Sequence, residues 1–140
     1  MRFFRSIFIT FTVWNLTALL NALLMGTVLS ILSNEFRQWS FTFGFAIVFT
    51  LIFSIPGIFI FWVVLTIKWH DDDLFRSLLK VGFIVSALSS LILYNLPFGL
   101  TNHEMFLLSL CIVIAAIASI MMHRSTIISI NNNKQIESHA

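Results

Sequence analysis

The stretch SFTFGFAIVFTLIFSIPGIFIFWVVLTI, residues 40–67, contains no charged side chain and decides the class of fold. About 28 residues make a helix of roughly 42 Å, which is longer than the hydrocarbon core of a bilayer, about 30 Å thick. After its first six residues the stretch is almost continuously apolar, without the alternation of apolar and polar residues that marks a strand of a membrane barrel. The stretch therefore predicts a membrane-spanning α-helix that tilts or projects beyond the bilayer.

Three further apolar segments accompany this one, separated by polar clusters. The predicted spans cover about residues 6–33, 40–67, 74–95 and 102–122. Only 10% of the 140 residues are charged, whereas soluble domains carry about 25%. We predict an all-α integral membrane protein in which four transmembrane helices form two antiparallel hairpins in one bundle. This domain covers residues 1–124, and residues 125–140 are expected to be a polar cytoplasmic tail.

The basic residues predict the orientation of the chain in the bilayer. Seven of the eight lie on the side that holds both termini and the loop after the second span: Arg2, Arg5, Lys68, Arg76, Lys80, Arg124 and Lys134. Because basic residues of short loops stay in the cytoplasm, both termini are predicted to be cytoplasmic. The basic excess is then explained by topology, and nucleic acid is not an expected partner. So short a chain with such short loops favours a bacterial inner membrane.

Small residues recur at four-residue spacing in every predicted span. Close backbone packing and polar contacts hold helices together in lipid, where burial of apolar side chains does not. The stripes predict a tightly packed bundle, with the lipid bilayer, a second copy or another membrane protein as partner. Their members are Ala18, Ala22, Gly26 and Ser30; Ala46, Thr50 and Ser54; Gly82, Ser86 and Ser90; and Cys111, Ala115, Ala118 and Ser119.

Amide side chains well inside a span occur only at Asn15 and Asn21. Asn15 precedes Ala18 by one turn, so we expect its side chain to point into the bundle and bond to a neighbouring helix. Interhelical hydrogen bonding is the favoured role for a neutral amide at this depth. The alternative is a solute path, lined by Asn15, Asn21, Thr50, Ser54 and Tyr94.

The pair Pro56-Gly57 interrupts the second span. Pro56 lacks the amide that would bond to the carbonyl of Ile52, and its ring crowds that carbonyl. We predict a kink here, which either bends a long helix or forms the flexible point of a solute path.

Polar and aromatic residues mark the helix ends. Thr101 and Glu104 have the spacing of a capping box, in which each side chain accepts from the backbone amide of the other residue. Trp39 and Trp69 are expected to be anchors at the two membrane surfaces.

The densest charge lies in KWHDDDLFRSLLK, residues 68–80. Asp73 is expected to be the N-cap of the third span. Consecutive carboxylates point in different directions and lack the spacing of a calcium loop, so we predict no metal site, and no catalytic residue or cofactor is expected. Asp71 and Asp72 remain as candidates for docking a partner.

Two functions follow from the sequence. The first is a non-enzymatic multi-pass membrane protein that serves as a subunit, or as an assembly, immunity or regulatory partner, through helix packing and the charged loop. The second is a small oligomeric channel or transporter for an ion or small solute. No recognised catalytic motif supports an enzyme.

Overall fold

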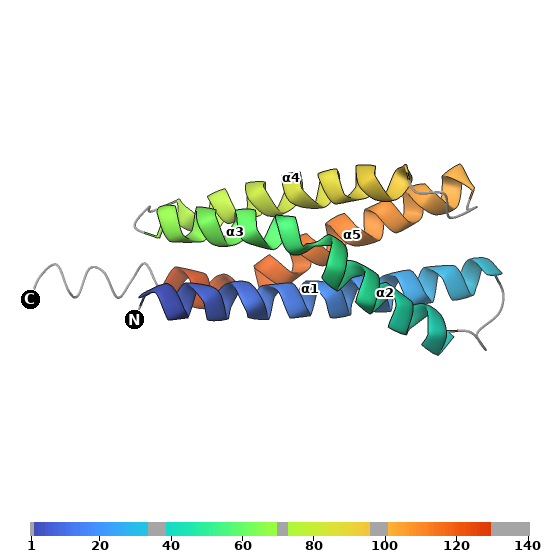
Figure 1. Cartoon of the computed structure of the whole chain (residues 1–140), viewed down its shortest axis with the longest axis horizontal. Helices are drawn as coiled ribbons and strands as arrows, with labels where there is room; N and C mark the ends of the chain where they lie inside the picture. Colours follow the sequence, from blue (N-terminus) through green and yellow to red (C-terminus); the bar gives the residue numbers. More distant parts are fainter. Residues whose placement is uncertain (1, 34–38, 70–72, 96–100, 130–140) are drawn as a thin grey trace, which may run out of the picture.

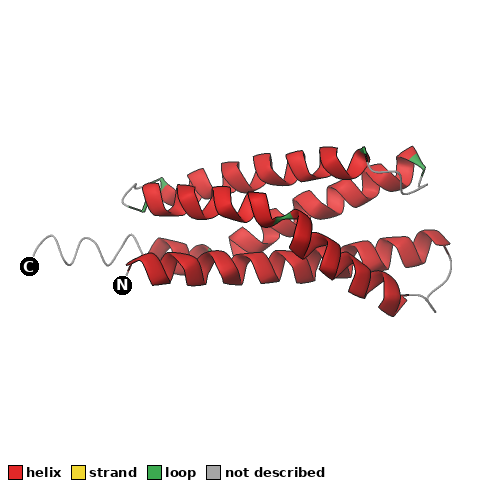
Figure 2. Ribbon diagram, viewed as in Figure 1, coloured by secondary structure: helices red, strands yellow, loops and turns green. Residues whose placement is uncertain are grey.

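The computed structural model describes residues 2–33, 39–69, 73–95 and 101–129, and within these ranges all regular structure is helical (Figure 2). The helices are α1 (Arg2–Ser33), α2 (Trp39–Phe53), α3 (Ile55–Ile67), α4 (Leu74–Tyr94) and α5 (Asn102–Met122). The prediction of an all-helical chain is confirmed. The predicted span boundaries agree with these helices to within a few residues, because charged and capping residues fix them locally.

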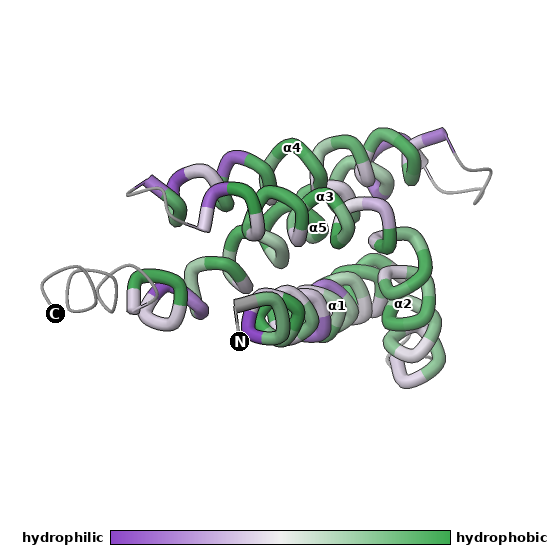
Figure 3. Tube along the Cα trace, turned by 60° about the vertical axis from the view of Figure 1, so that its left-hand side comes forward, coloured by the Kyte–Doolittle hydropathy of each residue, from purple (hydrophilic) through white to green (hydrophobic). Residues whose placement is uncertain are grey.

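Several helices are long and apolar enough to cross a membrane. α1, α4 and α5 each meet this criterion alone, and α2 with α3 meets it as one span broken by a bend of 53°. Figure 3 shows that apolar residues dominate the helices, while hydrophilic segments lie mainly towards their ends. Large apolar side chains also cover the outer surface, among them Phe4, Phe41 and Ile67. An apolar outer surface of this kind is typical of a protein surrounded by lipid.

The helices lie lengthwise beside one another, and α1, the bent pair α2 with α3, α4 and α5 run in alternating directions (Figure 1). The most extensive contacts join α1 with α2, α4 with α5, and α1 with α5, while α3 packs against α4 and α1. Small residues mediate these contacts. Ala22 and Ala115 are fully buried, and a methyl group added to Gly82 would collide with Ile120 of α5. The small-residue stripes are thus largely used inside the chain.

The bend between α2 and α3 lies at Ser54, two residues before Pro56. Ser54 is the N-cap of α3, and Pro56 occupies the first turn of that helix, where a missing amide is tolerated. The predicted interruption at Pro56-Gly57 therefore coincides with a break of the helix. Because of the bend, α3 stays against α4, whereas α2 turns away and packs mainly on α1 (Figure 1).

Two apolar clusters form the interior. One contains Ile9, Leu65, Trp69, Leu78 and Ile120, and lies towards the end of the molecule that holds the N-terminus. The other contains Ala22, Met25, Ala46, Leu108 and Cys111.

Two residues of the first of these clusters were expected to lie elsewhere. Trp69, expected as an anchor at the membrane surface, is buried in the cluster. Residues 124–129 are helical, and Ile127, which belongs to the predicted polar tail, is buried in the same cluster. The rest of the predicted tail, residues 130–140, lies outside the described residues.

The capping box at the start of α5 is confirmed. The Glu104 amide donates to Thr101 Oγ1 at 3.4 Å, and the Thr101 amide donates to Glu104 Oε2 at 2.7 Å. Asp73 occupies the predicted N-cap position of α4, but its side chain makes no capping hydrogen bond.

Candidate functional site

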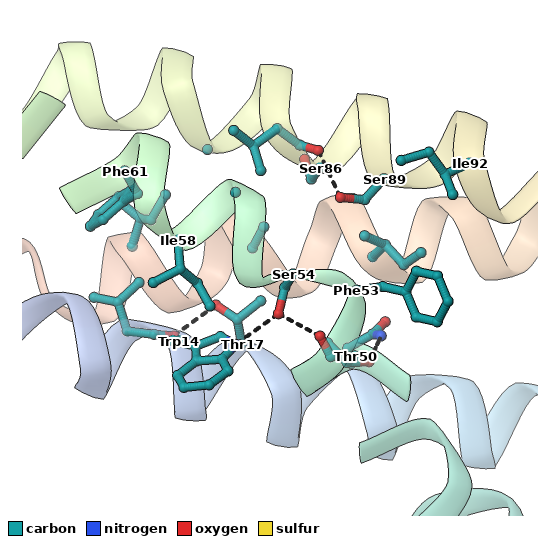
Figure 4. A pocket seen from close by; sticks show the side chains of 18 of the residues that line it. Trp14, Thr17, Thr50, Phe53, Ser54, Ile58, Phe61, Ser86, Ser89 and Ile92 are labelled. Carbon is teal, nitrogen blue, oxygen red and sulfur yellow. Dashed lines mark hydrogen bonds between the residues drawn. The ribbon is translucent and has the colours of Figure 1, made fainter. Parts of the chain in front are cut away.

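Hydrogen bonds join α1 to the last turn of α2 and to Ser54 at the break between α2 and α3 (Figure 4). Trp14 Nε1 of α1 donates to Ser54 Oγ at 2.7 Å, and Ser54 Oγ donates to the carbonyl of Thr50. Asn21 Nδ2 of α1 donates to Thr50 Oγ1 at 2.7 Å, and Thr50 Oγ1 donates to the carbonyl of Ala46 at 2.7 Å. Two side chains of α1 thus hold the broken span, Trp14 at the bend itself and Asn21 one turn before it in α2.

The local sequence explains why these groups meet. Serine and threonine in a helix return their proton to a carbonyl three or four residues earlier, which leaves the oxygen free to accept. Thr50 and Ser54 are one turn apart and both do this, so both offer lone pairs to α1. A buried indole or amide requires such an acceptor. Trp14 and Asn21 lie about two turns apart on α1 and reach these oxygens.

A cavity of about 110 Å³ lies beside the break, where α2 turns away from α4. All five helices contribute to its wall. Figure 4 shows Ser86 and Ser89 of α4 on one side of the space, with Thr17, Thr50 and Ser54 on the other. The wall also contains members of both apolar clusters, so the cavity lies between them.

Two polar atoms next to the cavity lack a hydrogen-bond partner. Thr10 Oγ1 and Asn21 Oδ1 are both buried and unpaired, and both residues line the cavity. Leaving a buried polar group unpaired costs about 1–3 kcal/mol. Asn21 Nδ2 meanwhile also contacts Met25 Sδ at 3.2 Å, so the amide nitrogen is satisfied and only its oxygen is not.

The structure gathers three of the five predicted path residues. Asn21, Thr50 and Ser54 lie together at the cavity. Tyr94 is exposed at the end of α4 and does not line it.

The expectation that Asn15 points into the bundle is wrong. Its side chain is exposed, and Nδ2 donates to the carbonyl of Phe11 on the same helix at 2.8 Å. Counting back in steps of four from the buried residues Ala22 and Ala18 leads to Trp14. Asn15 is the next residue along the helix and points about 100° away from that line. Trp14 therefore takes the inward position that was assigned to Asn15.

Sequence reasoning missed several cross-helix donors. Trp62 Nε1 of α3 donates to Ser6 Oγ of α1 at 3.1 Å, and Ser119 Oγ of α5 donates to the Val13 carbonyl of α1 at 2.8 Å. Ser90 Oγ of α4 also reaches the Ser109 carbonyl of α5 at 3.2 Å. Tryptophans deep in a span were the available signal, because a buried indole N–H needs an acceptor.

Of the charged segment 68–80, the structure describes residues 68, 69 and 73–80. Asp71 and Asp72 lie outside the described residues. Beside them, Lys68 Nζ donates to Ser77 Oγ at 3.1 Å, and the Arg124 guanidinium lies 5.7 Å from the centre of the Phe75 ring. Within residues 2–33, 39–69, 73–95 and 101–129, three or more His, Cys, Asp or Glu side chains do not meet in a group able to hold a metal.

Searches against protein families, curated protein sequences and solved structures find no match for this chain. The assignment of a function therefore rests on the site itself.

Proposed function

We propose that the protein is a multi-pass membrane protein that binds a small uncharged solute at the α2–α3 break, as a carrier or an oligomeric channel. The observation that carries this proposal is the meeting of Asn21, Thr50 and Ser54 beside a cavity within the helices. In the proposed arrangement α1, α2 with α3, α4 and α5 are four spans in one bundle, made of two hairpins. Neither this function nor the alternative below requires catalysis.

The broken span supports a binding role. Irregular backbone inside a membrane is tolerated where it is buried in protein or lines a cavity, and transporters place substrate sites at such breaks. Here the break lies next to the cavity, and Gly57 forms part of the wall. The cavity wall, as far as the described residues form it, contains no charged side chain, which suits a neutral solute better than an ion.

The surroundings of the cavity suggest an entry route. A second groove lies between α1 and α3, and Thr10, Trp14 and Ile58 line both it and the cavity. These three side chains therefore form the partition between groove and cavity. The bond from Trp14 to Ser54 holds the partition in place, and breaking it would connect the two spaces.

The basic residues suggest how the protein is oriented in the membrane. Arg5, Lys68, Arg76 and Arg124 lie within about one turn of a helix end, and Lys80 lies in the second turn of α4. Figure 1 shows the corresponding ends of α1, α3, α4 and α5 on the side of the N-terminus. The positive-inside rule puts this end in the cytoplasm. A bacterial inner membrane is the proposed location.

The first prediction tests solute passage with a variant that fills the cavity. Ser89 lines the cavity, and its hydroxyl bonds only to the Val85 carbonyl of its own helix. We expect Ser89→Leu to reduce the flux of small neutral solutes, such as glycerol and urea, into proteoliposomes at least tenfold. Osmotic swelling followed by light scattering measures this.

Thr27→Leu is the matched control. Thr27 also bonds to a carbonyl of its own helix, that of Leu23, but it is exposed and outside the cavity. We expect flux through this variant to equal that of the original protein. Equal flux through the Ser89→Leu and original proteins would refute passage through the cavity.

The second candidate is a non-enzymatic subunit or a regulatory partner of another membrane protein or of a second copy. The observation in its favour is the exposed basic end of the molecule. Arg76 and Lys80 are exposed and lie on one face of α4, in the first two turns after the loop that carries Asp71 and Asp72. The small-residue stripes contribute less than expected, because they are largely buried within the chain.

Replacement of the two loop carboxylates tests this candidate. We expect Asp71→Asn with Asp72→Asn to leave membrane insertion intact and to reduce recovery of a partner in crosslinking and blue-native electrophoresis severalfold. Charge-preserving replacement of both by glutamate is the control and should retain the complex. Unchanged recovery with the asparagine variant would remove the loop from any docking role.

A further inference from the structure

Five of the six hydroxyl groups that line the cavity have already donated their proton; the exception is Thr10. Each of the five bonds to a carbonyl three or four residues earlier in the chain. The hydroxyls are those of Thr17, Thr50, Ser54, Ser86 and Ser89. Towards the cavity, these oxygens can therefore offer only lone pairs.

The nitrogen donors in the wall are also used. Trp14 Nε1 donates to Ser54, and Asn21 Nδ2 donates to Thr50 and contacts Met25 Sδ. An indole has one proton and an amide nitrogen has two, so neither group has a proton left. Among the hydroxyl, indole and side-chain amide groups of the wall, only the Thr10 hydroxyl keeps an unused proton.

The two unpaired atoms complete this pattern. Asn21 Oδ1 is an acceptor without a donor, and Thr10 Oγ1 is a hydroxyl that makes no hydrogen bond. A ligand hydroxyl is both donor and acceptor, so one such group could donate to an acceptor of the wall and accept from Thr10. A small side-chain rotation is needed, because neither atom is exposed on the present cavity surface.

The apolar part of the wall limits the rest of the ligand. Phe49, Phe53, Ile58 and Phe61 line the space together with the hydroxyls. Apolar cavities of about 150 Å³ bind benzene. A volume of about 110 Å³ thus suits a small ring or a short chain.

We infer that the cavity binds an apolar molecule that carries one hydroxyl group, such as phenol or the hydroxylated ring of a larger membrane-soluble compound. The inference rests on the proposed solute site and specifies its chemistry: the ligand hydroxyl supplies the hydrogen-bond donor that Asn21 Oδ1 lacks. A molecule of equal size without a donor leaves Asn21 Oδ1 unpaired and binds more weakly.

A pair of probes of nearly equal shape tests this inference. 4-Fluorophenol and 4-fluorotoluene differ by a hydroxyl in place of a methyl group. Fluorine NMR titration of the full chain in lipid nanodiscs measures both, with empty nanodiscs to subtract partition into lipid. We expect saturable binding of 4-fluorophenol about five- to tenfold tighter than that of 4-fluorotoluene, the factor that corresponds to one net hydrogen bond.

A variant assigns the preference to the cavity. Thr10→Val replaces the unpaired hydroxyl by a methyl group and breaks no hydrogen bond of the protein. We expect it to weaken binding of 4-fluorophenol severalfold and to leave that of 4-fluorotoluene unchanged. An unchanged preference in this variant would overturn the role of the hydroxyl.

The outcomes separate this inference from the proposed function. Equal saturable binding of the two probes would overturn the donor requirement and leave the cavity as a binding site for apolar solutes. Binding of neither probe would overturn the inference. The proposed function is tested separately, and it fails if Ser89→Leu leaves the flux of small solutes unchanged.

Discussion

Replacing Gly82 by leucine is expected to lower the free energy of unfolding by about 3 kcal/mol, the upper part of the usual cost of overpacking a core. Gly82 is buried where α4 crosses α5, and even its first added carbon would collide with Ile120 Cδ1. Ile120 is itself buried in the apolar cluster with Leu65 and Leu78, so a shift large enough to admit a leucine side chain disturbs the packing of that cluster. Reversible unfolding of the reconstituted protein in SDS measures the change.

Gly44 provides the matched control. It lies on the exposed face of α2, and a carbon added there meets nothing within 4 Å. Gly44→Leu should leave stability unchanged or raise it by up to about 1 kcal/mol, because glycine is a poor helix former. Truncating the neighbour should relieve the collision, so Gly82→Leu with Ile120→Ala should be more stable than the sum of the single changes predicts. An equal loss in the two leucine variants would contradict the packing described.

Features that a few consecutive residues determine could be predicted from sequence. Proline removes one amide, so the break near Pro56 follows from a single residue. The capping box of Thr101 and Glu104 needs only its own four residues. The spacing of small residues placed Ala22, Gly82 and Ala115 at helix contacts, because side chains four apart share one face.

The site could be predicted only in part, because it depends on rotation along α1. Residues four apart in a helix are rotated by about 40° from one another, so a stripe of such residues winds around the helix. The side of the stripe that faces the bundle at one end of a long helix therefore does not indicate which side faces it at the other end. Asn21 lies on that face and Asn15 does not. The bond between Trp14 and Ser54 joins residues 40 apart in sequence, and no local pattern contains it. The burial of Ile127 likewise depends on a cluster that other helices build.

Asn21→Leu is expected to weaken the binding of a hydroxyl-bearing ligand at least tenfold without weakening the fold. The change removes one hydrogen bond to Thr50, and membrane double-mutant cycles give such bonds about 0.6 kcal/mol on average. It also removes the unpaired Oδ1, whose burial costs about 1–3 kcal/mol. The two terms nearly cancel or favour leucine, so the free energy of unfolding should stay constant or rise by about 1 kcal/mol. Affinity for 4-fluorophenol should fall at least tenfold in the same nanodisc titration, because the wall loses its unpaired acceptor.

The other amide of α1 supplies the control for this variant. Asn15→Leu changes an exposed side chain that bonds only to its own helix, so affinity and stability should both stay unchanged. Stability and affinity together distinguish a role of Asn21 in packing from a role in ligand binding. If Asn21 serves only to join α1 to α2, Asn21→Leu should cost stability and leave the affinity of the remaining folded protein unaltered. Stability lost with affinity retained would therefore assign Asn21 to the scaffold, whereas affinity lost with stability retained assigns it to the ligand. Natural proteins commonly keep an unsatisfied polar group where function requires it, at the expense of stability.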